Sequence, residues 1–244
     1  MKALQILLVG VTALSGCTKK PEVSAMKITT DTTTTVKQTT ADSINYLALG
    51  DSYTVGEAEP SDASYPHQLT NSLRSYAGLN VDYPTIIATT GWTTQDLISA
   101  IAASSINAKK YDFVTLLIGV NDQYQQLSQS DYQVKFAQVL NTAINFAYGD
   151  TSRVFVLSIP DWGVTPFGAG QDSIIGPQID QFNAINKAIS LKAGVHYINI
   201  TDISREAATD PSLIAPDGLH PSASMYALWV SRLEPIVAAR LKEK

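Results

Sequence analysis

From Ile44 onward the chain alternates short apolar runs with longer segments whose apolar residues recur at helical spacing. The apolar runs, at 44–49, 81–88, 111–118, 153–159 and 195–200, are predicted to be strands. The helical segments are 65–76, 94–103, 131–147, 177–192 and 222–241. Strands that alternate with long helices are joined by right-handed crossovers and run parallel. This pattern predicts an α/β fold, a three-layer α/β/α sandwich with a five-stranded parallel sheet.

The composition suits one globular domain and excludes several kinds of partner. The chain has 244 residues, of which 45% are hydrophobic and 16% charged, which is enough to bury a full core. The net charge of -5 gives no electrostatic footprint for nucleic acid, and no basic run forms a polybasic membrane patch. We therefore predict no nucleic-acid partner, and the sequence leaves the oligomeric state open.

The N-terminus has the pattern of an export signal. Met1-Lys2 is followed by an apolar run over 3–14 that is too short to span a bilayer, and then by small residues. The sequence Leu-Ser-Gly-Cys at 14–17 resembles the bacterial lipobox, in which the cysteine is lipidated and becomes the mature N-terminus. The alternative is a plain secretory signal with an incidental cysteine. Because Cys17 is the only cysteine, the chain has neither an internal disulfide nor a multi-cysteine metal site.

A Thr-rich segment separates this signal from the first predicted strand. Its composition shows no apolar periodicity, which is typical of a flexible tether. The predicted organisation is a signal peptide at 1–16, a lipidated Cys17 with its tether at 17–42, and the folded domain at 43–244. Such a protein would be extracytoplasmic, in the periplasm or on the cell surface, and would contact a bacterial membrane only through the acyl chains on Cys17.

A serine follows the first predicted strand directly, in the sequence Gly50-Asp51-Ser52. By itself this tripeptide is more often an ordinary turn than a nucleophile. Parallel strands nevertheless present their carboxyl ends at one edge of the sheet, where α/β folds bind ligands. Three further segments should reach the same edge: 89–94, 119–122 and 216–221.

These segments supply the groups that acyl transfer needs. A serine hydroxyl requires a base, and of the three histidines only His220 lies in a loop of this edge. Asp217, three residues earlier, can reach one imidazole nitrogen and fix the tautomer. The backbone N–H groups of Ser52 and Gly91 and the amide of Asn121 can converge on a developing oxyanion. The alternative is a solvated loop before the last helix and two common turn sequences.

Together these motifs resemble the SGNH, or GDSL-type, hydrolase family. The family pattern is Gly-Asp-Ser near the start, a glycine after the second strand, Gly-x-Asn-Asp after the third and Asp-x-x-His near the end. The resemblance implies a flavodoxin-like fold and a catalytic triad of Ser52, His220 and Asp217. It also implies an oxyanion hole formed by Ser52, Gly91 and Asn121. Tyr53 stands where the family often has leucine, and the chain lacks the Gly-x-Ser-x-Gly elbow of α/β-hydrolases.

Aromatic residues near these motifs are candidates for the walls of a substrate pocket, although a structural role explains them equally well. The candidates are Tyr53, Trp92, Tyr124, Trp162 and Phe167. Asp51 and Asp122 are expected to brace loops. Asp161 can bind a cation, but no other carboxylates have metal-ligand spacing, so we predict no metal and no cofactor.

The sequence therefore predicts a serine esterase that forms an acyl-enzyme. The resemblance allows acyl esters of small molecules, glycans or lysophospholipids, and thioesters, as substrates. One alternative is a non-catalytic surface lipoprotein that binds a glycan or a protein on the same fold. A second alternative is a flavodoxin-like cofactor binder, which the absence of a Gly-rich phosphate loop disfavours.

Overall fold

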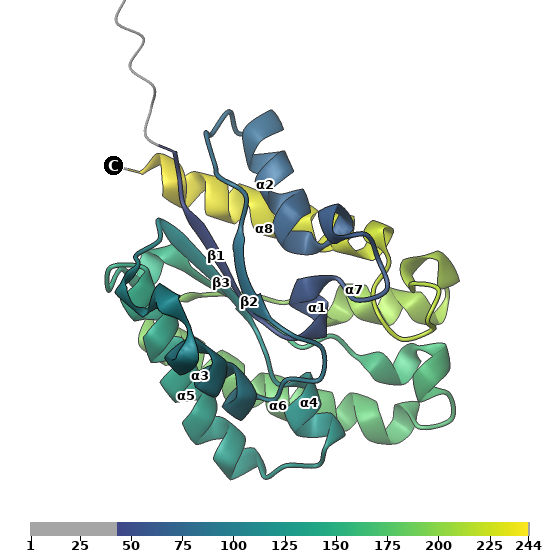
Figure 1. The fold of residues 1–244 in the computed structure, drawn as a ribbon. Helices are drawn as coiled ribbons and strands as arrows, with labels where there is room; N and C mark the ends of the chain where they lie inside the picture. Colours follow the sequence, from purple (N-terminus) through teal and green to yellow (C-terminus); the bar gives the residue numbers. More distant parts are fainter. Residues whose placement is uncertain (1–42, 244) are drawn as a thin grey trace, which may run out of the picture. The chain divides into compact units, whose positions relative to one another are not determined.

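The computed structural model describes residues 43–243, so the predicted signal peptide, Cys17 and the tether lie outside the described residues. A five-stranded parallel sheet forms the centre, in the order β2-β1-β3-β4-β5 (Figure 1). The strands are β1 (Tyr46–Gly50), β2 (Thr85–Ala88), β3 (Phe113–Leu117), β4 (Val154–Leu157) and β5 (His196–Ile198). This order is that of flavodoxin-like folds.

Helices cover both faces of the sheet, which confirms the predicted α/β/α sandwich (Figure 1). One face carries α2 (Tyr65–Ser75) and α8 (Ala223–Lys242), which pack against each other. The other carries α3 (Thr94–Ala103), α5 (Gln129–Phe146) and α6 (Asp172–Ala193). The first crossover leads from β1 to β2, in one direction along the sheet. The later crossovers, from β2 through β3 and β4 to β5, lead in the opposite direction. Right-handed crossovers therefore place α2 opposite the next three helices.

The remaining elements are short and lie in the connections. The α-helical ones are α1 (Ser52–Val55), α4 (Val120–Tyr124) and α7 (Thr201–Arg205). The 3₁₀ turns are Ser61–Ala63, Ser105–Ala108, Thr151–Arg153, Trp162–Val164, Pro166–Gly168, Glu206–Ala208 and Pro211–Leu213. Within residues 43–243, no helix combines the length and the apolar character that a membrane span needs.

The predicted element boundaries differ from the observed ones mainly at prolines. The second strand begins at Thr85 rather than at Val81, which makes only an isolated bridge to Ile44. Pro84 lies between them and has no N–H for the ladder. The helix predicted from Pro177 begins at Asp172, and Pro177 lies exposed inside it. Because proline is most frequent in the first helical turn, the start of this helix was predicted at Pro177 and was placed too late in the chain.

The core forms where the helices meet the sheet. β1, β3 and β4 are buried along their whole length, as expected for strands covered on both faces. The predicted stripe of α5 is buried at Phe136, Val139, Leu140 and Ala143, and Ile144 is partly buried. The predicted face of α8 is also buried, at Tyr226, Trp229, Val230 and Leu233.

A close approach at Gly50 fixes the passage from β1 into α1. A Cβ atom at this position would overlap Thr54 Oγ1 and the carbonyl oxygen of Leu117 on the neighbouring strand. Only glycine fits where the chain turns this tightly. The turn sets Ser52 at the first position of α1, above the carboxyl end of the sheet.

Candidate active site

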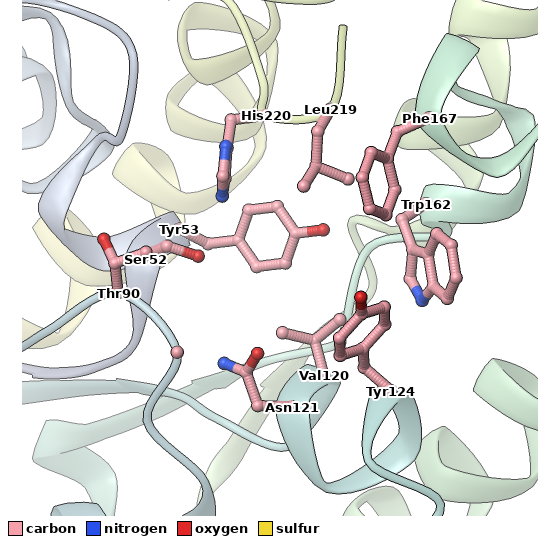
Figure 2. Close-up of a pocket in the computed structure, with 11 residues that line it drawn as sticks. Ser52, Tyr53, Thr90, Val120, Asn121, Tyr124, Trp162, Phe167, Leu219 and His220 are labelled. Carbon is pink, nitrogen blue, oxygen red and sulfur yellow. The ribbon is translucent and has the colours of Figure 1, made fainter. Parts of the chain in front are cut away.

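A pocket of about 180 Å³ lies at the carboxyl end of the sheet (Figure 2). Loops that follow β1, β2, β3 and β4 meet there with the loop before α8. Its lining residues are Ser52, Tyr53, Thr90, Gly91, Val120, Asn121, Tyr124, Trp162, Phe167, Leu219 and His220. Ser52, Gly91, Asn121 and His220 thus lie around one cavity, as expected for loops at the carboxyl edge of a parallel sheet.

His220 is held by Asp217 within one loop. The imidazole Nδ1 lies 2.5 Å from Asp217 Oδ2. Asp217 Oδ1 accepts the backbone N–H groups of Leu219, at 2.9 Å, and of His220, at 3.0 Å. Partial burial raises the pKa of Asp217, but these hydrogen bonds outweigh it and hold the pKa below its usual value. A carboxylate on Nδ1 leaves Nε2 to face the pocket, where Figure 2 shows the ring pointing toward Ser52.

Hydrogen-bond donors lie on the side of Ser52 that is opposite to His220. Asn121, on α4, donates from Nδ2 to the backbone oxygen of Trp92 at 2.9 Å. This bond fixes the amide, and the second hydrogen on Nδ2 remains for a ligand. Gly91 has φ +85°, a conformation that other residues rarely adopt, and among the described residues none but its chain neighbours comes within 4 Å of where its Cβ would stand.

Two buried carboxyl groups brace the loops beside the serine. Asp51 caps α1 and accepts the backbone N–H of Tyr53 at 3.1 Å. Asp122 Oδ2 accepts the backbone N–H of Thr94 at 2.8 Å and its hydroxyl at 3.0 Å, which ties α4 to the start of α3. Burial raises the pKa of Asp51 to about 8, and the charge of Asp122 adds to the shift. Neither residue lines the pocket.

Four of the five predicted aromatic residues line the pocket, and Trp92 does not. The prediction for Trp92 is wrong because its half-buried side chain packs against the hydrophobic core, and only its backbone oxygen meets Asn121. Thr90, Val120 and Leu219 also line the pocket, and none of them was predicted from the sequence. Each of these is a direct neighbour of a motif residue, and that adjacency was the available signal.

Tyr53 packs against the imidazole ring of His220. Its ring lies edge to face against His220, with ring centroids 5.7 Å apart, and against Trp229 of α8, at 6.3 Å. The side chain is buried, and burial raises the pKa of its phenol. The residue that departs from the family motif is therefore a neighbour of the imidazole as well as a wall of the pocket.

The remaining histidines and Asp161 lie outside the pocket. His67 pairs with the hydroxyl of Ser64, and His196 stacks on Phe155. Asp161, the predicted candidate for a cation ligand, forms an ion pair with Arg205 at 2.9 Å. Within the described part of the chain, no three metal-ligating side chains gather at one place.

The motifs and this geometry agree with a comparison with protein families. The model of the GDSL-like lipase/acylhydrolase family matches residues 48–228, which include Ser52, Gly91, Asn121 and His220. The chain belongs to this family. It is therefore a carboxylic ester hydrolase with the SGNH fold, as the motifs predicted. No curated protein sequence matches the chain.

Solved structures, two of them esterases, share the fold at low sequence identity. TesA is 15% identical with a TM-score of 0.64, over 80% of this chain and 99% of TesA. Axe2, an acetylxylan esterase from Geobacillus stearothermophilus, is 18% identical with a TM-score of 0.62, over 82% and 95%. The psychrotrophic esterase EstA from Pseudoalteromonas sp. is 14% identical with a TM-score of 0.62, over 82% and 100%. At these identities the likeness concerns the fold.

Proposed function

We propose that this protein is a serine esterase in which Ser52 is the nucleophile, His220 the base and Asp217 the orienting carboxylate. The observation that carries the proposal is that His220, which faces Ser52 across one pocket (Figure 2), is bonded through Nδ1 to Asp217. A carboxylate on Nδ1 stabilises the imidazolium that forms when Nε2 takes the serine proton. Binding alone would require none of these three groups in this arrangement.

The reaction proceeds through an acyl-enzyme. Ser52 Oγ attacks the ester carbonyl while His220 Nε2 takes its proton. The negative oxygen of the tetrahedral intermediate is held by the backbone N–H groups of Ser52 and Gly91 and by the amide of Asn121. His220 then gives its proton to the leaving alcohol, and the C–O bond to that alcohol breaks. Water, deprotonated by His220, attacks the acyl-enzyme and releases the acid and the free serine.

The pocket favours a short acyl group. Its volume of about 180 Å³ corresponds to about six molecules of liquid water. Most of its walls are apolar or aromatic, with Tyr53, Trp162 and Leu219 among them (Figure 2). A long alkyl chain would have to leave the pocket, so we expect the rate to peak at acetyl or propionyl esters.

The first test is hydrolysis of 4-nitrophenyl acetate by the full chain beside its Ser52→Ala variant. We expect the variant to lose activity by a factor on the order of 10⁶, down to background. Ser190→Ala is the matched control, because Ser190 is a buried serine on α6 whose hydroxyl donates to the backbone of Asn186. Equal rates in all three proteins, with no labelling of Ser52 by an organophosphate, would favour the non-catalytic binding protein.

We also propose that the enzyme is a lipoprotein that is exported and anchored through Cys17. The support is the lipobox-like sequence at 14–17 directly after a short apolar run. A single acyl chain binds membranes only weakly, whereas the two or three chains of a lipoprotein anchor it. The full protein made in bacteria should enter the detergent phase on phase separation, and Cys17→Ser should move it to the aqueous phase. A wild-type protein in the aqueous phase would contradict the anchor.

A further inference from the structure

A second hollow adjoins the catalytic pocket, between α4 and the first turns of α6. It has a volume of about 480 Å³ and shares Tyr124, Trp162 and Phe167 with the pocket, so these three rings border both hollows. Glutamines dominate its lining, and we call it the glutamine groove. Its lining residues are Gln123, Tyr124, Gln126, Trp162, Phe167, Gln171, Ile174, Ile175 and Gln178.

A chain of hydrogen bonds fixes which way two of these amides point. The indole Nε1 of Trp162 can only donate, and it donates to Gln123 Oε1 at 2.8 Å. Gln123 must then turn its amide nitrogen outward, and Nε2 donates to Gln178 Oε1 at 2.7 Å. Gln178 in turn must present its own amide nitrogen away from Gln123. Among the described residues, Gln178 Nε2 has no protein acceptor, so the groove offers a positioned donor.

The groove is neutral and has aromatic edges. None of its lining residues is charged, and His220 is the one titratable base in the adjoining pocket. The rings of Tyr124 and Phe167, each about half exposed, stand with centroids 6.4 Å apart at the border of the two hollows (Figure 2). Aromatic faces pack against the C–H faces of sugar rings, and neutral amides bind hydroxyl groups without favouring an ion.

We propose that the glutamine groove binds the sugar part of an O-acylated glycan, while the acyl group enters the catalytic pocket. This inference rests on the proposed function and names its substrate class. The sugar ring would lie on Tyr124 and Phe167, with its oxygens accepting from Gln178 Nε2. A lysophospholipid fits the site poorly, because the lining of both hollows contains no lysine or arginine to pair with a phosphate.

The sharpest test is Gln178→Glu. Glutamate keeps an oxygen to accept from Gln123, so the bonds to Gln123 and Trp162 persist. It removes the amide donor and presents a second acceptor to the sugar oxygens. The substrates are mono-O-acetylated β-1,4-linked trisaccharides of glucose, xylose and N-acetylglucosamine, compared with 4-nitrophenyl acetate. We expect the ratio of kcat/KM on the preferred trisaccharide to that on the nitrophenyl ester to fall about tenfold, mainly through KM.

Gln181→Glu is the matched control. Gln181 lies on the same helix, and its Oε1 also accepts from a glutamine amide, that of Gln129, at 2.6 Å. It lines neither hollow, so the same charge change there should leave the ratio unchanged. An equal fall in both variants would overturn the proposal, since it would show a charge effect of α6 rather than loss of a donor. An unchanged ratio in Gln178→Glu would also overturn it.

Two further readouts separate this proposal from the proposed function. Ser52→Ala should bind the acetylated trisaccharide in a calorimetric titration, and Ser52→Ala/Gln178→Glu should bind it about tenfold more weakly. Ser52-dependent hydrolysis of the nitrophenyl ester with no trisaccharide turnover would keep the esterase and overturn the glycan groove. Acetyl-lysophosphatidylcholine as a better substrate than every trisaccharide would overturn it as well. Loss of all Ser52-dependent hydrolysis would instead contradict the proposed function.

Discussion

Asp51, beside Ser52, and Asp217, beside His220, accept the same kind of backbone hydrogen bond in their loops. Their pKa values are nevertheless shifted in opposite directions. Each aspartate precedes a proposed catalytic residue and accepts the backbone N–H two residues later, at Tyr53 and at Leu219. Asp51 is fully buried, and burial raises its pKa to about 8. The Asp217 side chain is 33% exposed, and its pKa is lowered by the bonds from His220 and the loop backbone, which outweigh partial burial.

The difference places charge where the chemistry uses it. In the proposed mechanism an anionic Asp217 stabilises the imidazolium of His220 during proton transfer. An anionic Asp51 beside Ser52 would instead repel the oxyanion that forms there, and its raised pKa keeps it largely protonated at neutral pH. The serine side is thus made of neutral donors and the histidine side holds the negative charge. The presence of an aspartate in each motif does not set its protonation state. The extent of burial decides whether the carboxyl group is protonated or anionic.

Removing the charge on the histidine side should have the largest effect. Asp217→Asn keeps an oxygen for the loop backbone but turns an amide nitrogen, a donor, toward His220 Nδ1. We expect kcat on 4-nitrophenyl acetate to fall by roughly 10⁴, because the wrong tautomer is favoured and the imidazolium loses its partner. A loss smaller than tenfold would show that Ser52 and His220 work as a dyad.

Removing a neutral donor on the serine side should cost less. Asn121→Ala deletes the amide proposed to hold the oxyanion, and we expect kcat to fall roughly 10²–10³-fold with KM little changed. Circular dichroism and a thermal melt would show that the fold survives, since Asn121 makes one side-chain hydrogen bond, to the backbone oxygen of Trp92. Unchanged kcat would remove Asn121 from the oxyanion hole.

Asp51→Asn should have the smallest effect on activity and a distinct effect on stability. Asparagine can still accept the N–H of Tyr53, and it resembles the protonated acid in shape and charge. We therefore expect kcat at pH 7 to change by no more than about threefold, a loss of roughly 0.7 kcal/mol. A hundredfold loss would instead show that the charge of Asp51 takes part in catalysis.

The pH dependence of unfolding separates the two aspartates. The unfolded chain loses the Asp51 proton near pH 4, whereas the folded chain keeps it up to about pH 8. Between these values the unfolded state binds fewer protons. The free energy of unfolding therefore falls as pH rises, by at most about 1.4 kcal/mol per pH unit from this group. Asp51→Asn lacks this slope, so its stability relative to wild type should rise from pH 4 to pH 8.

Asp217 should behave in the opposite sense in the same urea titrations. Its pKa is lowered in the folded state, so its stabilising contribution is present above about pH 4 and is lost as pH falls through the folded pKa. Asp217→Asn should therefore differ from wild type most at neutral pH and least in acid. Parallel pH profiles for the two variants would show that the pKa values of Asp51 and Asp217 are not shifted in opposite directions.

The sequence was sufficient to predict the layers of the fold and to predict that the motifs lie at one edge of the sheet. Periodicity identified each strand and long helix, and the parallel topology brought Ser52, Gly91, Asn121 and His220 to one edge. These positions follow from chain order, because strand ends of a parallel sheet coincide whatever the side chains between them do.

Side-chain direction and burial could not be predicted in the same way. Trp92 and Tyr124 are both aromatic residues close to motifs, yet one packs on the core and the other lines the pocket. The glutamine groove depends on α6 beginning before Pro177, which the proline pattern concealed. The bond from Trp162 to Gln123 joins residues 39 positions apart, and no local pattern announces it.

The packing of α2 against α8 has a consequence for the order in which the enzyme becomes active. Ser52 and α2 belong to the first part of the domain to be synthesised, whereas His220 and α8 belong to the last. Tyr53, which supports the imidazole, also rests on Trp229 of α8. A growing chain therefore contains Ser52 before His220 and Trp229 have been synthesised. If Ser52 and His220 act as proposed, esterase activity begins only when the end of the domain docks.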